Sequence, residues 1–186
     1  MNACRARGFN LIELMIVVAI VAILTVVALP GFSGMLQNSN TRSAADSIEN
    51  GIRFAQGEAV RLNRITTFTP TSTGGWSVTY TQITGAGDTG SNVLQTQPST
   101  YSSTLSVSPT TAISFNGLGR AGAGSTFSAA TGTTTFTPAT AEVAYLVANS
   151  STSASIKLSV RVSPSGKIRM CDPYKSFNAT TTPDGC

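Results

Sequence analysis

Residues 7–14, Arg-Gly-Phe-Asn-Leu-Ile-Glu-Leu, decide the fold, and the apolar run that they open continues from Leu14 to Leu29 as LMIVVAIVAILTVVAL. Thr25 is the only polar residue of that continuation. Glu13 lies at its start, although a carboxylate at the centre of a bilayer costs about 2.5–3.5 kcal/mol. The stretch therefore predicts a helix for an apolar environment, in which another group compensates the charge of Glu13.

The apolar stretch is long enough to span a membrane. A transmembrane helix needs about 20 apolar residues to cross about 30 Å of hydrocarbon, and Phe9 to Leu29 supplies 21 (positions 9 to 29). Arg5 and Arg7 precede it, and no basic residue follows before Arg42. Because basic residues accumulate on the cytoplasmic side, we expect a single-pass inner-membrane protein with a cytoplasmic N-terminus and a periplasmic head.

An ordinary secretory signal peptide also has a basic start and an apolar core. Glu13 interrupts the early core here, and the run is longer than the roughly 7–15 residues of such a core. The helical pattern also continues past Pro30 instead of ending at a small-residue cleavage site. These features favour a segment that the mature protein keeps; a simple uncleaved anchor stays open as an alternative.

The pattern Gly8-Phe9, Glu13, apolar run and Pro30 resembles the class III signal of type IV pilins and pseudopilins. In that family a prepilin peptidase cuts after the glycine and methylates the new N-terminal amine. The resemblance implies a leader at residues 1–8, cleavage after Gly8 and N-methylation of Phe9. The new amine and a neighbouring subunit's Glu13 would then form one ion pair from two costly charges.

Three further segments are expected: a transmembrane or filament-core helix at 9–30, an amphipathic helix at 31–64 that continues into the head, and a β-rich head at 65–186. Pro30 and Gly31 predict a kink or local melting between the two helical halves. Helical spacing resumes downstream, at Ile48, Ile52, Ala55, Ala59 and Leu62. The spacing also predicts surface ion pairs, namely Arg42 with Asp46, Glu49 with Arg53, and Glu58 with Arg61.

After Asn63 the sequence becomes rich in Thr, Ser, Gly and Val, with short alternating runs typical of strands. The expected strands are Ile65–Phe68, Trp76–Gln82, Thr104–Val107, Ala112–Phe115, Thr133–Thr137, Val143–Val147, Ile156–Val162 and Lys167–Cys171. The polar stretch at 85–103 is expected to be a long loop of unknown role. The fold class is therefore α+β, one long helix packed on an antiparallel sheet.

Segments of the helix and head resemble the GspH/FimT family of minor pilins and pseudopilins. They are Arg42–Ala45, Ile52–Ala59, Ala112–Arg120 and Ser165–Arg169. The resemblance implies the type IV pilin fold. Gly117-Leu118-Gly119-Arg120-Ala121-Gly122 also fits a dinucleotide-binding pattern, but no helix is expected to open on it, so a glycine-rich turn is the better interpretation.

Cysteine positions indicate one disulfide. Cys4 lies in the leader, which leaves Cys171 and Cys186, and an even pair in an exported chain favours a bond worth about 3 kcal/mol. Two free thiols are the alternative. The chain has no His, so we expect neither a metal site nor a cofactor. Glu58, Asp88 and Glu142 form no recognisable catalytic set, so we do not expect an enzyme.

Net charge does not identify a partner. The formal charge of +4 comes from 12 basic and eight acidic residues, and loss of Arg5 and Arg7 with the leader reduces it to +2. Lys167, Arg169 and Lys175 near the C-terminus could nevertheless contact DNA phosphates weakly and with strong salt dependence. Some FimT-type pilins take up DNA through a Gly-Arg-x-Arg motif. Here Gly166-Lys167-Ile168-Arg169 has Lys in place of one Arg, which keeps the charge but loses the bidentate geometry.

The resemblance implies a minor type IV pilin that helps to prime pilus assembly at or near the tip. Its expected partners are the prepilin peptidase, other minor and major pilins or pseudopilins, and the inner membrane. A minor pseudopilin of the type II secretion system is the first alternative, and a DNA-binding pilin for natural transformation is the second. The terminal cysteine pair favours the pilus, because a disulfide-bound terminal loop resembles pilins more than pseudopilins.

Overall fold

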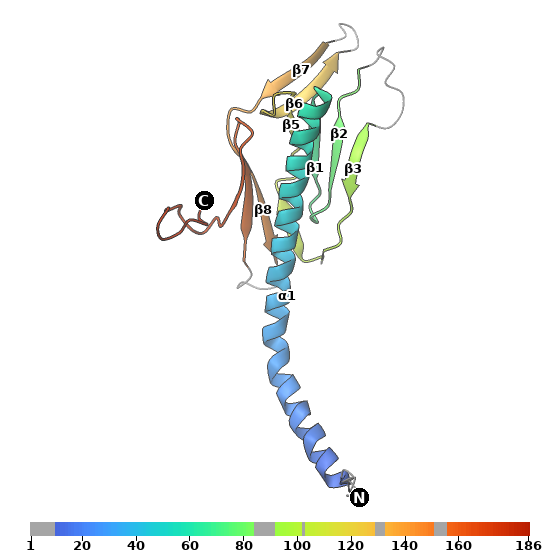
Figure 1. Ribbon diagram of the computed structural model, residues 1–186, viewed down its shortest axis with the longest axis vertical. Coiled ribbons are helices and arrows are strands. Elements are labelled where there is room, and N and C mark those ends of the chain that lie inside the picture. Colours follow the sequence, from blue (N-terminus) through green and yellow to red (C-terminus); the bar gives the residue numbers. More distant parts are fainter. Residues whose placement is uncertain (1–9, 84–91, 102, 129–132, 151–155) are drawn as a thin grey trace, which may run out of the picture. The chain divides into compact units, whose positions relative to one another are not determined.

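The structure of the protein, a computed structural model (Figure 1), describes residues 10–83, 92–101, 103–128, 133–150 and 156–186. The side chains of residues 27–31, 125–128 and 133–134 are not described. The expected leader at residues 1–8 and Phe9 therefore lie outside the described residues. The chain divides into two units, residues 1–36 and residues 37–186.

The first unit is helical. Helix α1 (Leu11–Leu62) begins where the Asn10 carbonyl accepts hydrogen bonds from the amides of Glu13 (3.0 Å) and Leu14 (3.2 Å). The Thr25 hydroxyl donates back to the carbonyls of Val21 (3.0 Å) and Ala22 (2.8 Å), so this one polar side chain is satisfied within the helix. In the described part of the chain, no helix has both the length and the apolarity needed to cross a membrane.

Pro30 and Gly31 lie within α1, and their backbone is helical. A proline inside a helix removes one backbone hydrogen bond and its ring crowds the preceding turn. The loss of that hydrogen bond is a known cause of kinks in helices. The kink or local melting that we expect at these two residues stays a prediction.

In the second unit, α1 turns a buried face toward the head. The residues of that face are all 0% exposed: Ala44, Ala45, Ile48, Ile52, Ala55 and Ala59. The predicted stripe is therefore confirmed from Ile48 to Ala59, and Leu62 is half-buried. Because four of the six side chains are alanine, the strands can approach the helix closely, and the larger side chains of the sheets fill the interface.

Two of the three ion pairs predicted on α1 form, those of Arg53 with Glu49 and of Arg61 with Glu58, both at 2.5 Å. The prediction of a pair between Arg42 and Asp46 is wrong, because no ion pair joins them in the structure. An acid that precedes a base by four residues is better oriented than the reverse order, and Arg42 precedes Asp46 here.

Among the described residues, ten strands form two sheets. The expected fold class, a long helix packed on antiparallel β-structure, is confirmed, and the β-structure is divided between these two sheets (Figure 1). The six-stranded sheet has the order β3-β2-β1-β5-β6-β7, and its strands are β1 (Thr66–Pro70), β2 (Trp76–Tyr80), β3 (Val93–Gln97), β5 (Ile113–Phe115), β6 (Ala121–Ser128) and β7 (Thr133–Pro138). The four-stranded sheet has the order β10-β9-β8-β4, and its strands are β4 (Leu105–Ser108), β8 (Val143–Asn149), β9 (Leu158–Val162) and β10 (Ile168–Cys171). All these pairings are antiparallel.

Each of the eight expected strands is present, and its two ends lie within two residues of the expected positions. Two further strands, β3 and β6, were not expected. Strand β3 lies inside the stretch 85–103 that we expected to be a loop, and that expectation is corrected. Its side chains are at most half-buried, because it is the edge strand next to β2, so it lacks the apolar alternation that marks other strands. Strand β6 begins with the glycine-rich sequence AGAG, which sequence rules assign to a turn.

The core joins both sheets to the helix through Phe68. Its ring lies 5.9 Å from that of Trp76 in its own sheet and 6.1 Å, edge-on, from that of Tyr145 in the other. Phe68 and Tyr145 are 0% exposed. The Tyr145 hydroxyl donates to the Thr111 carbonyl at 2.8 Å, and burial raises the pKa of Tyr145. The helix and the two sheets therefore share one apolar core.

Candidate functional site

The predicted site residues lie in separate parts of the chain. Gly8 and Phe9, the expected processing positions, lie outside the described residues. Glu13 lies in the first turn of α1, where a carboxylate favours the positive end of the helix dipole. Lys167 directly precedes β10, Arg169 lies on β10, and Lys175 lies in the C-terminal loop that follows this strand.

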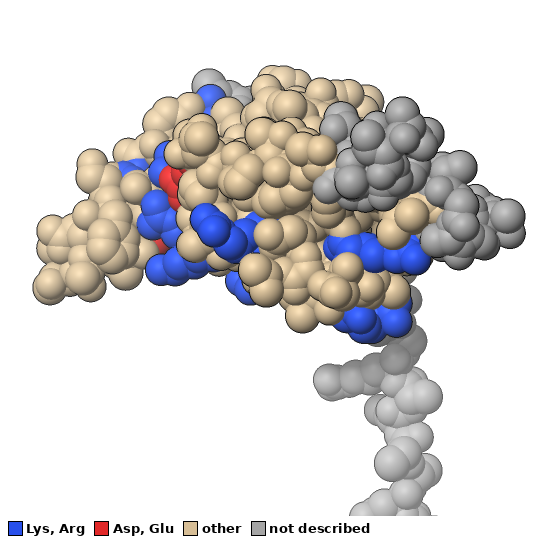
Figure 2. Space-filling view, turned by 90° about the horizontal axis from the view of Figure 1, so that it is seen from above, with Lys and Arg blue, Asp and Glu red and all other residues tan. Residues whose placement is uncertain are grey.

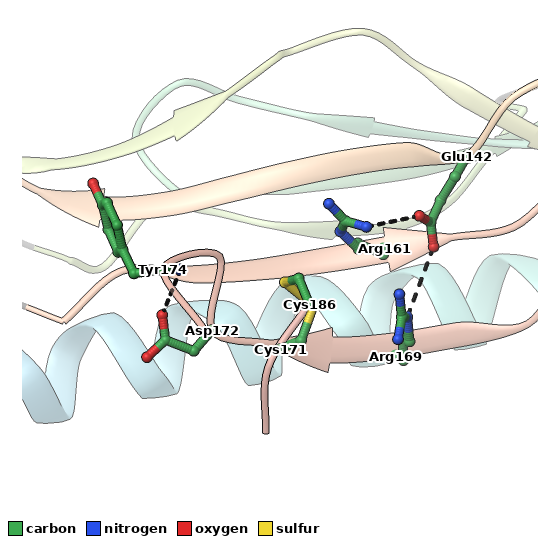
Figure 3. Close-up of a disulfide and its surroundings, with 7 residues drawn as sticks. All are labelled: Glu142, Arg161, Arg169, Cys171, Asp172, Tyr174 and Cys186. Atoms are coloured by element: carbon green, nitrogen blue, oxygen red, sulfur yellow. Dashed lines mark hydrogen bonds and ion pairs between the residues drawn. A yellow bond between two sulfur atoms is a disulfide. The ribbon is translucent and has the colours of Figure 1, made fainter. Parts of the chain in front are cut away.

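The C-terminal loop is closed by the predicted disulfide between Cys171 and Cys186, with an S–S distance of 2.12 Å (Figure 3). Cys171 ends β10 and is 5% exposed. Backbone bonds add to this closure: the Asp172 amide donates to the Asp184 carbonyl at 2.7 Å, and the Cys186 amide donates to the Asp172 carbonyl at 3.1 Å. The loop is thus a defined structure attached to an edge strand.

Lys175 is neutralised within this loop. Its ammonium lies 2.5 Å from the carboxylate of Asp184 and 3.7 Å from that of Asp172. The hydrogen bond to Asp184, together with the charge of that carboxylate, raises the pKa of Lys175. The same hydrogen bond lowers the pKa of Asp184. A side chain that is held by two acids is poorly placed to serve as a free phosphate contact.

Arg169 shares one carboxylate with a second arginine. Arg169 on β10 lies opposite Arg161 on β9 in the register of the sheet, and Glu142, just before β8, reaches both (Figure 3). Glu142 lies 3.0 Å from the Arg161 guanidinium and 3.8 Å from that of Arg169. This acid separates two like charges that would otherwise repel each other across the strands.

Lys167 differs from the other two predicted cations. It is exposed and follows a tight turn in which the Gly166 amide donates to the Ser163 carbonyl at 2.8 Å. Gly166 has a φ of 88°, which favours glycine. Among the described residues Lys167 has no ion pair. Lys167, Arg169 and Lys175 therefore have three different electrostatic surroundings, and only Lys167 keeps an uncompensated charge.

On the face seen from above, basic side chains do not merge into one surface. Figure 2 shows Lys and Arg in several separate groups on the face seen from above, with acidic side chains beside only one of them. Strong non-specific binding of DNA needs several cations that neutralise neighbouring phosphates together. The arrangement in this view is therefore suited to local contacts more than to a long polyanion.

The glycine motif that begins at Gly117 is a turn, as the sequence predicted. The Gly119 amide donates to the Asn116 carbonyl at 2.8 Å, and a strand follows, not a helix. Gln56 of α1 donates one amide hydrogen to the Gly119 carbonyl (2.8 Å) and one to the Gly166 carbonyl (2.9 Å). Sequence reasoning missed this contact, because the three residues are distant along the chain. In the part of the chain described, no cluster of His, Cys, Asp and Glu could hold a metal.

Comparisons with known proteins agree with this architecture. Residues 44–166 match the model of a family described as "Type II transport protein GspH", and residues 4–29 match the "Prokaryotic N-terminal methylation motif". No curated protein sequence matches the chain.

Among solved structures, the chain matches two crystal forms of the type IV minor pilin FimU of Pseudomonas aeruginosa (strain PAO1). The first is 15% identical, with a TM-score of 0.50, and covers 80% of this chain and 96% of FimU. The second is also 15% identical, with a TM-score of 0.46, and covers 78% of this chain and 98% of FimU. The first form supports the same fold, a long helix packed on antiparallel sheets.

Proposed function

Because this chain belongs to the GspH family of type IV pilin-like proteins, we propose that it is a minor type IV pilin that helps to prime pilus assembly. We place it at or near the filament tip. The family consists of structural subunits and not of enzymes. The proposal is supported by the match of residues 4–29 to the N-terminal methylation motif and of residues 44–166 to the GspH family in the same chain.

The observation that carries the proposal is the exposed apolar surface of α1 among the described residues of the first unit. Between positions 11 and 26, every Leu, Ile, Met and Val is 50–76% exposed. Exposed apolar surface of this extent marks a site of interaction with protein or membrane. An inner membrane before assembly and the core of a filament afterwards would both cover it.

Glu13 has a specific role in this proposal. After cleavage between Gly8 and Phe9, the new amine of one subunit and the Glu13 carboxylate of its neighbour meet in an apolar bundle. Two isolated charges there are costly, whereas a paired and hydrogen-bonded set is tolerated. The pairing would therefore fix the axial position at which a subunit enters the filament.

Glu13→Ala tests this role. We expect the variant to be processed normally but to be incorporated poorly, whereas Glu13→Asp, which keeps the charge, retains part of the function. The measurement is the amount of the protein in sheared filaments relative to its amount in the membrane fraction. Normal incorporation of Glu13→Ala would refute the role of Glu13.

A minor pseudopilin of a type II secretion system is the second candidate, and the description of the matching family favours it. Deletion of the gene distinguishes the two, with surface pili, twitching motility and exoprotein secretion scored in the same strain. Loss of pili and twitching supports the minor pilin. Loss of secretion alone supports the pseudopilin.

DNA binding for natural transformation is a third candidate, and it is compatible with the first. The exposed and unpaired Lys167 favours it, whereas the acids beside Arg169 and Lys175 predict weak binding. Lys167→Glu together with Arg169→Glu should lower both the affinity for DNA and its salt dependence. Unchanged values would exclude DNA binding through this face.

A further inference from the structure

A pocket of about 260 Å³ lies where α1, the start of β9, the end of β10 and the C-terminal loop meet. It is lined by charged side chains from the helix and the loop and by apolar side chains from the strands. Ligand sites for whole small molecules usually enclose about 300–1,000 Å³. This pocket is therefore of a size for one or two side chains of another protein.

Three cations and two acids line the pocket, and both acids form ion pairs within the chain. Asp172 and Asp184 both pair with Lys175. Arg42 and Lys157 remain, and neither has an acidic partner among the described residues. The pocket thus has a net charge of +1, and Arg42 and Lys157 are the two of its cations that no acid of the described chain contacts.

Lys157 is held in position by a neutral group. Its ammonium donates to the Tyr174 hydroxyl at 2.6 Å and lies 5.1 Å from the centre of that ring. Tyr174 is 72% exposed and forms part of the C-terminal loop. An aromatic hydroxyl orients the ammonium but leaves its charge in place, so Lys157 can still attract an anion.

Arg42 faces the same pocket from the exposed side of α1. The expected pairing with Asp46 does not form, which leaves its guanidinium available. A guanidinium and a carboxylate can form two parallel hydrogen bonds, and such bonds are roughly twice as strong as neutral ones. Arg42 and Lys157 together therefore favour a carboxylate over a neutral group.

The remaining walls are apolar and half-buried, formed by Ile156, Leu158 and Met170. A nucleic-acid backbone would leave these side chains without a suitable contact. A carboxylate side chain next to an apolar residue would match both parts of the pocket.

We propose that this pocket receives an Asp or Glu side chain, flanked by an apolar residue, from a neighbouring subunit of the filament. The inference rests on the proposed function as a filament subunit. It identifies Arg42 and Lys157 as the residues that select the neighbour, and the disulfide-closed loop as the element that holds Tyr174 beside Lys157.

Photo-crosslinking of the full-length protein in cells that assemble the filament tests the inference. As the rim reporter, a benzoylphenylalanine replaces Phe177, an exposed aromatic residue of the C-terminal loop, so that Tyr174 stays beside Lys157. A second reporter, in a separate strain, replaces Met15 in the apolar helix. We expect the rim reporter to capture a neighbouring subunit at a peptide that contains Asp or Glu. Arg42→Glu with Lys157→Glu should reduce this product about tenfold or more, because like charges at an interface cost several kcal/mol.

Two matched variants complete the design. Arg42→Lys with Lys157→Arg keeps both charges and should keep the crosslink. Arg120→Glu with Lys167→Glu makes the same change of net charge at exposed cations outside the pocket and should also keep it. Fluorescence of Trp76, which is 5% exposed, reports whether each head is folded.

Three results would overturn the inference. The crosslink survives the reversal of Arg42 and Lys157, or the captured peptide contains no acid, or only the Met15 reporter captures a subunit. In the third case the proposed function stands and the pocket has no part in it. If neither reporter captures a subunit, the proposed function fails together with the inference.

Discussion

Replacement of Gly51 by Ala tests the packing of the helix on the head. A Cβ at Gly51 would lie 2.7 Å from the nearest atom of the Trp76 ring and 2.8 Å from the Phe68 ring. Both rings are almost fully buried, and the Trp76 indole also donates to the Ser47 hydroxyl at 3.0 Å. Neither ring can move aside without disturbing the core.

Gly57 is the matched control on the same helix, because it is exposed and nothing lies within 4 Å of its new Cβ. Ala is favoured over Gly inside a helix by about 0.8–1.0 kcal/mol, so Gly57→Ala should raise the free energy of unfolding by about that amount. Gly51→Ala gains the same backbone contribution, but overpacking a core costs about 1–3 kcal/mol. We therefore expect Gly51→Ala to be less stable than Gly57→Ala by about 1–3 kcal/mol.

Urea unfolding of the full chain in a mild detergent measures this difference. Trp76 is the only tryptophan of the chain, so its fluorescence follows the packed interface directly. Gly51→Ala should also change the native emission, whereas Gly57→Ala should not. Equal free energies of unfolding for the two variants, within about 0.5 kcal/mol, would show that the helix is not packed on these rings.

Three further predictions use the same unfolding assay or a titration. Gln56→Met removes the two hydrogen bonds from α1 to the turns and should lower the free energy of unfolding by about 1–3 kcal/mol; an unchanged value would contradict the contact. Replacement of both Cys171 and Cys186 by Ser opens a loop whose ends are 15 residues apart and should lower the free energy of unfolding by about 3 kcal/mol. Reduction of the disulfide in the native protein should lower it by the same amount. Lys175→Met should raise the pKa of Asp184 toward 3.8, as measured by NMR of the carboxyl carbon.

The Lys175–Asp184 pair stabilises the folded chain over the pH range in which both groups are charged. The pKa of Asp184 is lowered in the folded chain, so its stabilisation is present above 3.8 and is lost as the pH falls through the lowered value. The pKa of Lys175 is raised, so its stabilisation is present below 10.5 and is lost as the pH rises through the raised value. If the free energy of unfolding falls as the pH is lowered below 3.8 in the native chain, and falls less in Lys175→Met, the result supports the pair.

Most of the strands that sequence rules could find have a buried face; β7 is an exception, found from its run of Thr and Phe although its described side chains are at most half-buried. In β1 the burial alternates along Thr66–Pro70, and in β4 along Leu105–Ser108. Strand β3 is at most half-buried and β6 begins with glycines, so neither carries the apolar alternation on which such rules depend. The helix stripe was predictable because its spacing is local.

The contacts of the candidate site divide in the same way. The disulfide could be predicted, because Cys171 and Cys186 are the only cysteines outside the expected leader. The pairing of Glu142 with Arg161 and Arg169 could not, because it depends on strands β8, β9 and β10 lying in that order. Charges distant along the chain become neighbours only when the register of a sheet is known.

Strand β4 has a consequence for how the chain folds during synthesis. It follows β3 in the chain but leaves that sheet, and it pairs with β8, where Leu105 lies opposite Asn149. The ribosome must therefore release β8 before β4 has any partner, and β5 to β7 are made in the interval. Distant pairings of this kind slow folding, because the intervening loop must close before the contacts form. The four-stranded sheet is therefore completed only after β8 has been made, and a chain interrupted before β8 exposes β4 as an unpaired strand.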